Sequence, residues 1–367
     1  MTSSELHWDI GTAYDLFVSL QVLHNPAEYG IGGVWAAGVR ARIPPNPRKI
    51  LEQSLLSIWI PYTWINSLPE PKDGNTVLWA LRNVPPGERL TALAHPHESQ
   101  LEQTEILGKV QARRAWDEKD QAALAEVYRR DCQPYEHKKP PSHQELAIIL
   151  DWWSRSEEFG EVYLEALEIY HEVFFRQEEK HIRPALQSAL SRAQEFSERI
   201  SLRDLLEVLT QGVRFEILPE ANKVVLAPSY WCTPFVYFGD LSQGRSIYLF
   251  GARPPEASLV PGEVVPDSLT NVLKALSDPT RLKILQYLAE KPLTPTQLSH
   301  LLRLRVPTVV HHLSTLRLAG LVRLTLGEEA VTKHYEARLE AVDTAYAALK
   351  GFINKDLPLE IPPEPAE

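Results

Sequence analysis

Residues 273–326 read LKALSDPTRLKILQYLAEKPLTPTQLSHLLRLRVPTVVHHLSTLRLAGLVRLTL, and this stretch decides the fold of the C-terminal region. Its first helix is predicted to begin at Asp278, whose carboxylate can accept from unpaired backbone N–H groups. Pro279 fits the first helical position because its missing N–H costs nothing there. The apolar residues that follow recur at helical spacing and predict a buried stripe: Leu282, Ile284, Leu285 and Leu288.

Two more helices are expected downstream. Thr294 and Pro295 repeat the start signal, and a short turn at 303–305 separates this helix from the next. Gly320 is expected to end the last helix as a left-handed cap. The residues predicted to face inward are Leu298, Leu301 and Leu302 on one helix and Val309, Leu313 and Leu316 on the other.

A β-hairpin completes the pattern. Residues 321–326 and 331–337 predict two strands around a turn at 327–330. Helices joined by a short turn and followed by a hairpin form a winged helix-turn-helix, in which the helix after the turn enters a DNA major groove. The pattern therefore predicts a DNA-binding fold.

The segment resembles the winged-helix domain of ArsR-type bacterial transcription regulators. The resemblance is carried by residues 276–282 (LSDPTRL), 308–313 (TVVHHL) and 316–322 (LRLAGLV). It implies sequence-specific binding of double-stranded DNA and regulation of transcription, with repression as the expected sign. It also implies a homodimer formed through terminal helices. Residues 1–250 loosely resemble an uncharacterised region that accompanies this domain in some ArsR-type regulators.

Eight side chains are predicted to contact DNA. Arginines at the turn and on the recognition helix are expected to bind phosphates or base edges. Polar residues on the outward face of that helix are expected to contact base edges, and cations on the hairpin are expected to bind backbone phosphate. These residues are Arg303, Arg305 and Arg317; Thr308, His311 and Ser314; and Arg323 and Lys333. Adjacent helical residues point about 100° apart, so His311 is expected to face DNA and His312 to fix the helix.

The recognition helix departs from the family pattern at its start. Arg305 stands where a Ser N-cap is usual, and apolar residues replace mostly polar ones at Val306, Pro307 and Val310. The hairpin turn carries Glu328-Glu329, where basic residues would favour phosphate. The domain is therefore expected either to read thymine methyl groups or to bind DNA weakly.

Charge is unevenly distributed. The chain has a net charge of −10, yet residues 265–336 hold nine Lys and Arg against six Asp and Glu. Phosphate neutralisation depends on local charge, so an acidic protein can still carry a DNA-binding segment. The surplus of three positive charges is small, which predicts moderate DNA affinity for each protomer.

No metal, cofactor or catalytic site is predicted. The family's metal-sensing positions fall near Thr294 and Thr296, which are poor ligands for soft metals, and at Ala345, where a His would be needed. His171-Glu172 begins like a zinc-protease helix, but Phe175 replaces the second His, which favours an ordinary solvated helix face. An enzyme built on residues 1–250 has no constellation to support it.

The predicted fold class is mainly α with small β elements: a large helical N-terminal domain and a C-terminal winged helix. The expected divisions follow the changes in pattern and in Pro content. They are 1–210 helical domain, 211–252 short-strand subregion packed on it, 253–266 Pro-rich linker, 267–336 winged helix, 337–355 dimerisation helix and 356–367 disordered tail.

The terminal helix carries one apolar stripe, which is the expected dimer interface. Its members are Leu339, Val342, Tyr346, Leu349 and Phe352. No apolar run approaches membrane-spanning length, and the N-terminus lacks the features of a signal peptide. Two cysteines in 367 residues fit a reducing cytoplasm.

The N-terminal region is expected to bind a small organic effector, because DNA binding alone does not require so many additional residues. All nine Trp lie outside the winged helix, and aromatic side chains often line ligand pockets. The residues predicted for the pocket wall are Trp152, Trp153, Tyr230 and Trp231. Two alternatives stay open: the region serves only dimerisation or partner binding, or the winged helix docks a protein without strong DNA binding.

Overall fold

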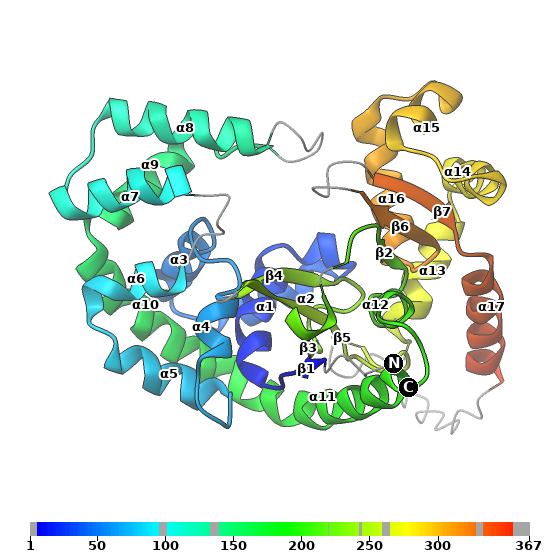
Figure 1. Cartoon of the computed structure of the whole chain (residues 1–367), viewed down its shortest axis with the longest axis horizontal. Helices are drawn as coiled ribbons and strands as arrows, with labels where there is room; N and C mark the ends of the chain where they lie inside the picture. Colours follow the sequence, from blue (N-terminus) through cyan, green and yellow to red (C-terminus); the bar gives the residue numbers. More distant parts are fainter. Residues whose placement is uncertain are drawn as a thin grey trace, which may run out of the picture.

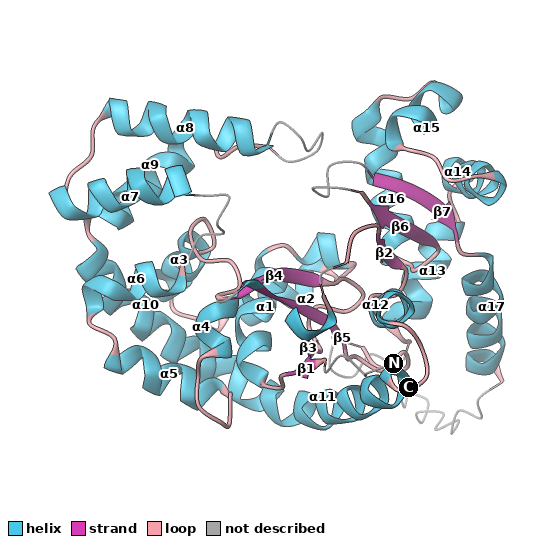
Figure 2. Cartoon of the chain, viewed as in Figure 1, coloured by secondary structure: helices cyan, strands magenta, loops and turns pink. Residues whose placement is uncertain are grey.

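The computed structural model describes residues 6–94, 101–132, 139–218, 220–241, 244–258, 265–327 and 333–354. Helices dominate, and the strands form two small sheets (Figure 1, Figure 2). This confirms the predicted class, with a large helical N-terminal part and a C-terminal winged helix. Within the described ranges, no helix is long and apolar enough to cross a membrane.

The N-terminal part is a stack of helices around one large core, to which α1 contributes an almost wholly buried helix. Between α10 and α11, residues His171–Phe175 form a π-helical turn. The helices are α1 Thr12–His24, α2 Gly33–Ala41, α3 Pro45–Ser54, α4 Tyr62–Asn66, α5 Gly74–Asn83, α6 Pro86–Leu93, α7 Leu101–Arg113, α8 Glu118–Cys132, α9 His143–Ser154, α10 Ser156–Tyr170, α11 Arg176–Ser197 and α12 Leu202–Leu209.

The larger sheet lies between helices in this part and has the strand order β1-β3-β5-β4. Strands β1, β3 and β5 are parallel, and β4 is antiparallel at the edge. Strand β3 is buried throughout because alternate side chains enter different cores: Val225 joins the α1 core, and Leu226 joins a core with α11 and α12. The strands are β1 His7–Trp8, β3 Val224–Ser229, β4 Tyr237–Leu241 and β5 Arg245–Gly251.

The winged helix has the predicted order of helices and strands and its own core (Figure 1). Leu282 and Leu301 are the exceptions to the predicted apolar stripes, since they are 49% and 48% exposed. The elements are α13 Asp267–Leu276, α14 Pro279–Glu290, α15 Pro295–Leu302, α16 Val306–Leu318, β6 Val322–Leu326, β7 Lys333–Ala337 and α17 Leu339–Ile353.

Strand β2, Val213–Phe215, lies in the predicted short-strand subregion but pairs with the winged helix. It pairs in parallel with β6 of the wing, with Val213 opposite Leu324, and gives a three-stranded sheet in the order β2-β6-β7. The expected short-strand subregion at 211–252 is therefore divided between two sheets. The cause is that Phe215 and Leu326 share one core with α11 and α12, so pairing with the wing buries both.

The described part of the predicted linker, 253–258, is fixed against its surroundings. Arg253 is buried, donates from Nη2 to the Thr233 carbonyl oxygen at 3.0 Å, and lies 3.7 Å from the Asp267 carboxylate. Ser268 Oγ donates to the Pro255 carbonyl oxygen at 2.7 Å. The start of α13 is thus tied to the chain that precedes it.

Candidate nucleic-acid interface

The helices of the motif begin where the sequence predicts. The Asp278 side chain accepts from Arg281 N at 3.0 Å, with Pro279 at the first position of α14. Thr294 and Gln297 form a reciprocal capping box at the start of α15, with distances of 3.2 and 2.9 Å. Each cap satisfies backbone donors that would otherwise be unpaired at the helix start.

The turn between α15 and α16 depends on Arg303, which adopts a left-handed conformation with φ 56°. This conformation ends α15 and lets Leu304 N donate to the Ser299 carbonyl oxygen at 3.1 Å. Arg305 follows in an extended conformation and precedes α16 without a side-chain cap. The turn leaves both arginine side chains exposed at the start of the recognition helix.

Helix α16 has a buried side and an exposed side. Val309, Leu313 and Leu316 are fully buried in the winged-helix core. The exposed side chains on and just before the helix include Arg305, Thr308, His311 and Ser314, together with Pro307. Their exposure is what base or phosphate contact requires, and their role in DNA binding stays a prediction.

His312 is half-buried beside Asp278 and Arg281. Burial lowers its pKa below the usual value even though the Asp278 carboxylate opposes this shift. A neutral imidazole at this position packs α16 against the start of α14. His311 is exposed instead, and the two ring planes are inclined by 55°.

The prediction that Arg317 contacts DNA is wrong. Its side chain is 6% exposed and points away from the exposed side of α16. Nη2 donates to the Thr210 carbonyl oxygen at 2.7 Å, and Nη1 donates to the Gln211 carbonyl oxygen at 3.1 Å. Burial, with a contribution from Arg338, lowers the pKa of Arg317 to about 10.

The carbonyl groups that Arg317 binds lie at the C-terminal end of α12. Gln211 and Gly212 both have positive φ, and Gly212 N donates to the Glu207 carbonyl oxygen at 2.8 Å, which ends the helix. Arg338 adds a bond from Nη1 to the Gln211 carbonyl oxygen at 3.0 Å. The negative end of the α12 dipole therefore attracts two cations of the winged helix.

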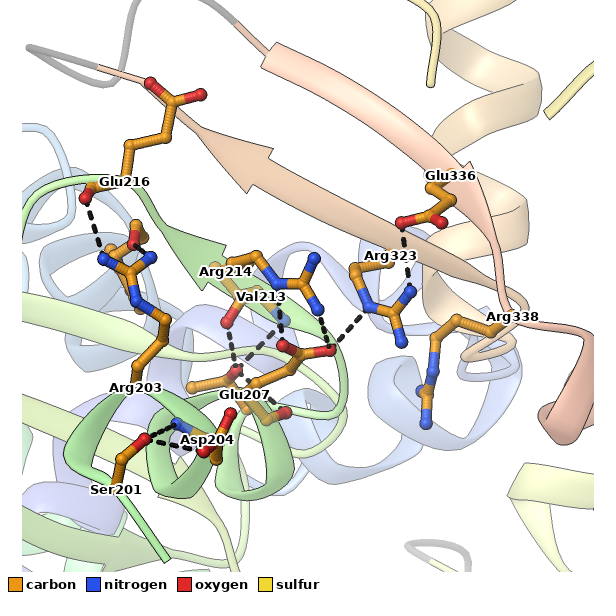
Figure 3. Close-up of polar contacts among 12 residues, drawn as sticks. Ser201, Arg203, Asp204, Glu207, Val213, Arg214, Glu216, Arg323, Glu336 and Arg338 are labelled. Carbon is orange, nitrogen blue, oxygen red and sulfur yellow. Dashed lines mark hydrogen bonds and ion pairs between the residues drawn. The ribbon is translucent and has the colours of Figure 1, made fainter. Parts of the chain in front are cut away.

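Arg323, the second predicted phosphate contact, is occupied by carboxylates. Nε donates to Glu207 Oε1 at 2.5 Å and Nη1 to Glu336 Oε2 at 3.0 Å (Figure 3). Glu340 lies 3.6 Å from Nη2. Burial opposes the charge of Arg323, but the carboxylates of Glu336 and Glu207 raise its pKa overall. The prediction that Arg323 holds DNA phosphate is therefore contradicted.

Lys333 is the first residue of β7 and is partly buried, which lowers its pKa. Its phosphate contact stays a prediction. The acidic turn residues Glu328 and Glu329 lie outside the described residues.

The apolar stripe of α17 lies on the outside of the chain. No residue of α17 is buried, and Leu339 and Tyr346 are 59% and 66% exposed. Val342 packs partly against the winged-helix core, while Leu349 and Phe352 are half-buried. Ile353, at 69% exposure, extends the stripe beyond the predicted set.

The four residues predicted for an effector pocket do not share one wall. Trp231 is fully buried and stacks on Trp35 at 5.9 Å, whereas Trp152 contacts Phe159 at 5.3 Å. Trp153 is 4% exposed and lies in the main core, against which Trp152 and Tyr230 pack partly buried. These side chains fill the interior of a large helical region, so the predicted pocket is wrong.

Sequence reasoning missed Glu207, Thr210 and Gln211, which receive the wing arginines. The signal available was the N-cap at Ser201 with Asp204, which marks the start of α12. Nothing in that pattern indicates which partner the helix end meets, because the contact spans more than a hundred residues.

Two side-chain helix caps, the left-handed turn at Arg303, a buried face on α16 and a hairpin define the C-terminal region as a winged helix-turn-helix module of the DNA-binding type. Residues 278–323 match the family model for bacterial regulatory proteins of the arsR family. This segment is therefore similar to the helix-turn-helix domain of arsR-family regulatory proteins. Comparison of the chain with curated proteins and with solved structures finds no significant match.

Among the described residues, no group of three or more His, Cys, Asp and Glu is placed to hold a metal ion. Thr294, one of the positions that correspond to the family's metal sites, caps α15 through its side chain. Ala345 packs partly against the winged-helix core.

Proposed function

We propose that the chain binds specific double-stranded DNA sequences as a transcription regulator and that α16 is its recognition helix. One observation carries this proposal: α16 buries Val309, Leu313 and Leu316 and exposes polar residues on the opposite side. A recognition helix needs this division, because one side must be held by its domain while the other enters the major groove.

The exposed face favours a mixed readout. Arg303 and Arg305 flank the start of α16 and suit phosphate, whereas Thr308, His311 and Ser314 suit base edges. Arg317 and Arg323 are withdrawn into internal contacts, so fewer cations remain for the backbone. The salt dependence of binding is therefore expected to be shallow for each protomer, at about 0.9 in the logarithmic slope per phosphate contact.

We propose a homodimer formed through α17. Leu339, Tyr346 and Ile353 present apolar surface that no described residue covers, on a helix that is otherwise anchored by Val342. Two copies joined in this way place two recognition helices on half-sites roughly 34 Å apart. Exposed apolar stripes of this kind are typical of association surfaces.

Repression is the proposed sign of regulation, because a dimer covering its operator blocks access to the same DNA. A promoter–reporter fusion that contains the selected operator tests this directly. Reporter output should rise when the chain is absent. A fall in output would show that the chain activates transcription instead.

The deciding experiment selects bound fragments from random duplex DNA at two salt concentrations. A common motif with two related halves, and affinity that falls with salt, is the expected result. Arg305→Ala is the matched variant, since it removes an exposed cation without touching the core. If no DNA fragment is retained and a protein partner binds regardless of salt concentration, the winged helix is instead a protein-docking module.

A further inference from the structure

A hollow of about 400 Å³ lies in the N-terminal part, away from the tryptophans predicted for an effector pocket. It lies between α4, the end of α6 and the antiparallel strands β4 and β5. Its lining residues are Thr63, Trp64, Asn66, Ser67, Ala92, Leu241 and Arg245. The volume is in the range of small-molecule sites.

The sequence holds this hollow in place through a close approach of α4 to β4. A side chain at Gly239 would meet the Tyr62 ring at 2.5 Å, so only glycine lets the helix pack here. Thr63 Oγ1 donates to the Asp240 carbonyl oxygen at 3.2 Å. Across the strand pair, Leu241 is opposite Arg245, so both residues belong to the lining of the hollow.

Arg245 lacks a partner among the described residues. Its Nε is buried and makes no hydrogen bond to them. Two buried arginines of the described residues are satisfied by carbonyl oxygens: Arg89 donates to three, and Arg317 donates to two. The buried Nη1 of Arg253 makes no hydrogen bond, but it lies 3.7 Å from the Asp267 carboxylate, whereas Arg245 has no carboxylate beside it among these residues. A buried donor without an acceptor is costly, so the position favours an acceptor supplied from outside.

The other lining groups restrict what that acceptor is. Thr63 and Ser67 already donate to backbone carbonyl oxygens, and Asn66 Nδ2 donates to Asp9 Oδ2 at 2.9 Å. The guanidinium is therefore the main source of free donors, and its planar fork matches a carboxylate. Trp64 and the neighbouring Ala92 and Leu241 offer apolar surface for a flat body.

The geometry points to a binding site for a small aromatic carboxylate, held by Arg245 through its carboxylate group and by Trp64 through its ring. The site lies at one end of β5, which runs from Arg245 to Gly251. Two residues beyond the other end, Arg253 meets Asp267 of α13. Strand β5 thus joins the hollow to the winged helix, and the bound carboxylate acts as the effector of DNA binding.

The regulatory half rests on the proposed function, whereas the binding site does not. A ligand alters DNA affinity only if it binds the two states of the chain unequally. The two halves are therefore tested by separate measurements on the full chain.

Calorimetric titration with benzoate and cinnamate tests the site. Both should bind at millimolar concentration or below, and benzamide, which has the same ring without the charge, should bind about tenfold more weakly. Arg245→Met should abolish benzoate binding, and Arg245→Lys should weaken it because a point charge cannot reproduce the planar fork. Arg199→Met, at an exposed arginine just after α11, is the control and should leave binding unchanged.

Absence of heat with both carboxylates, equal binding of benzamide, or unchanged binding by a folded Arg245→Met variant would overturn the site. Fluorescence anisotropy on the selected DNA fragment, with and without saturating benzoate, tests regulation. A change in DNA affinity of about fivefold or more is expected. Unchanged DNA affinity with benzoate bound overturns the regulatory half alone. Absence of any DNA binding refutes the proposed function, while the calorimetry still decides the site.

Discussion

Arg317 of the recognition helix donates a hydrogen bond of 2.7 Å to the carbonyl oxygen of Thr210, at the end of a helix in the N-terminal part. The bond fixes the orientation of α16 relative to α12. Arg317, an arginine that the sequence predicts at the DNA surface, thus links the winged helix to the N-terminal part of the chain.

Arg317→Met should lower the free energy of unfolding by about 2 kcal/mol or more, because it leaves two buried carbonyl oxygens without their charged donor. Thermal or denaturant unfolding of the full chain measures this. Arg305→Met, at an exposed position of the same domain without a side-chain cap, is the control and should change stability little. Equal stability of the two variants would show that the joint is not needed to hold the domains.

Arg305→Ala should weaken binding to every DNA sequence and reduce the logarithmic salt slope by about 1, as expected for a lost phosphate contact. Fluorescence anisotropy at several salt concentrations gives both quantities. Arg199→Ala, at an exposed arginine outside the winged helix, should leave the slope unchanged. If the logarithmic salt slope of the Arg305 variant equals that of the parent, Arg305 does not contact DNA phosphate.

His311→Ala should alter which sequences are selected while keeping the salt slope, because His311 faces outward at a base-reading position. Repeating the selection from random duplexes with this variant supplies the measurement. An unchanged motif would mean that His311 does not read bases.

Tyr346→Asp combined with Ile353→Asp should convert the dimer to monomers, because each places a charge on an exposed apolar position of α17. Both residues are exposed in the single chain, so protomer stability should change little. Sedimentation measures the mass, with Thr344→Asp, at an exposed position on the opposite side of α17, as the control. A dimer that survives the double substitution would locate the interface elsewhere.

Glu207 should make stability depend on acid. Burial tends to raise its pKa, but hydrogen bonds from Arg214 and Arg323 outweigh this and hold the pKa below the usual value near 4.5. A depressed pKa in the folded state means that the contribution to stability is present above pH 4.5 and is lost as pH falls below it. Melting temperature should therefore drop in that range, and less so in Glu207→Gln.

Glu195→Gln, an exposed change on α11, serves as the reference for this titration and should reproduce the parent's acid dependence. If Glu207→Gln follows the same curve as Glu195→Gln, the carboxylate between the two arginines does not couple folding to pH.

Local signals allowed much of the winged helix to be predicted. Asp278, Thr294 and Gly320 act on backbone groups within a few residues, so their sequence context is sufficient. The exposed face of α16 followed from the spacing of Val309, Leu313 and Leu316, because helical period decides which side is buried.

The rest depends on partners far away in sequence. Nothing near Arg317 or Arg323 shows that α12 will lie beside them, so both arginines look like surface cations. Strand β2 has three residues, too few for pattern to select a partner strand. The tryptophan content indicated an aromatic interior but could not show where a cavity lies. Arg245 became a candidate only in the structure, which shows that its buried Nε has no hydrogen-bond partner among the described residues.

The parallel pairing of β2 with β6 sets an order of events during synthesis. Val213 leaves the ribosome more than a hundred residues before Leu324, its neighbour in the finished sheet. Until then β2 is an open edge, and the arginines that complete the junction do not yet exist. The core that Phe215 shares with α11, α12 and Leu326 is therefore completed only when the wing has been synthesised, and a chain truncated before Leu324 carries β2 without its partner strand.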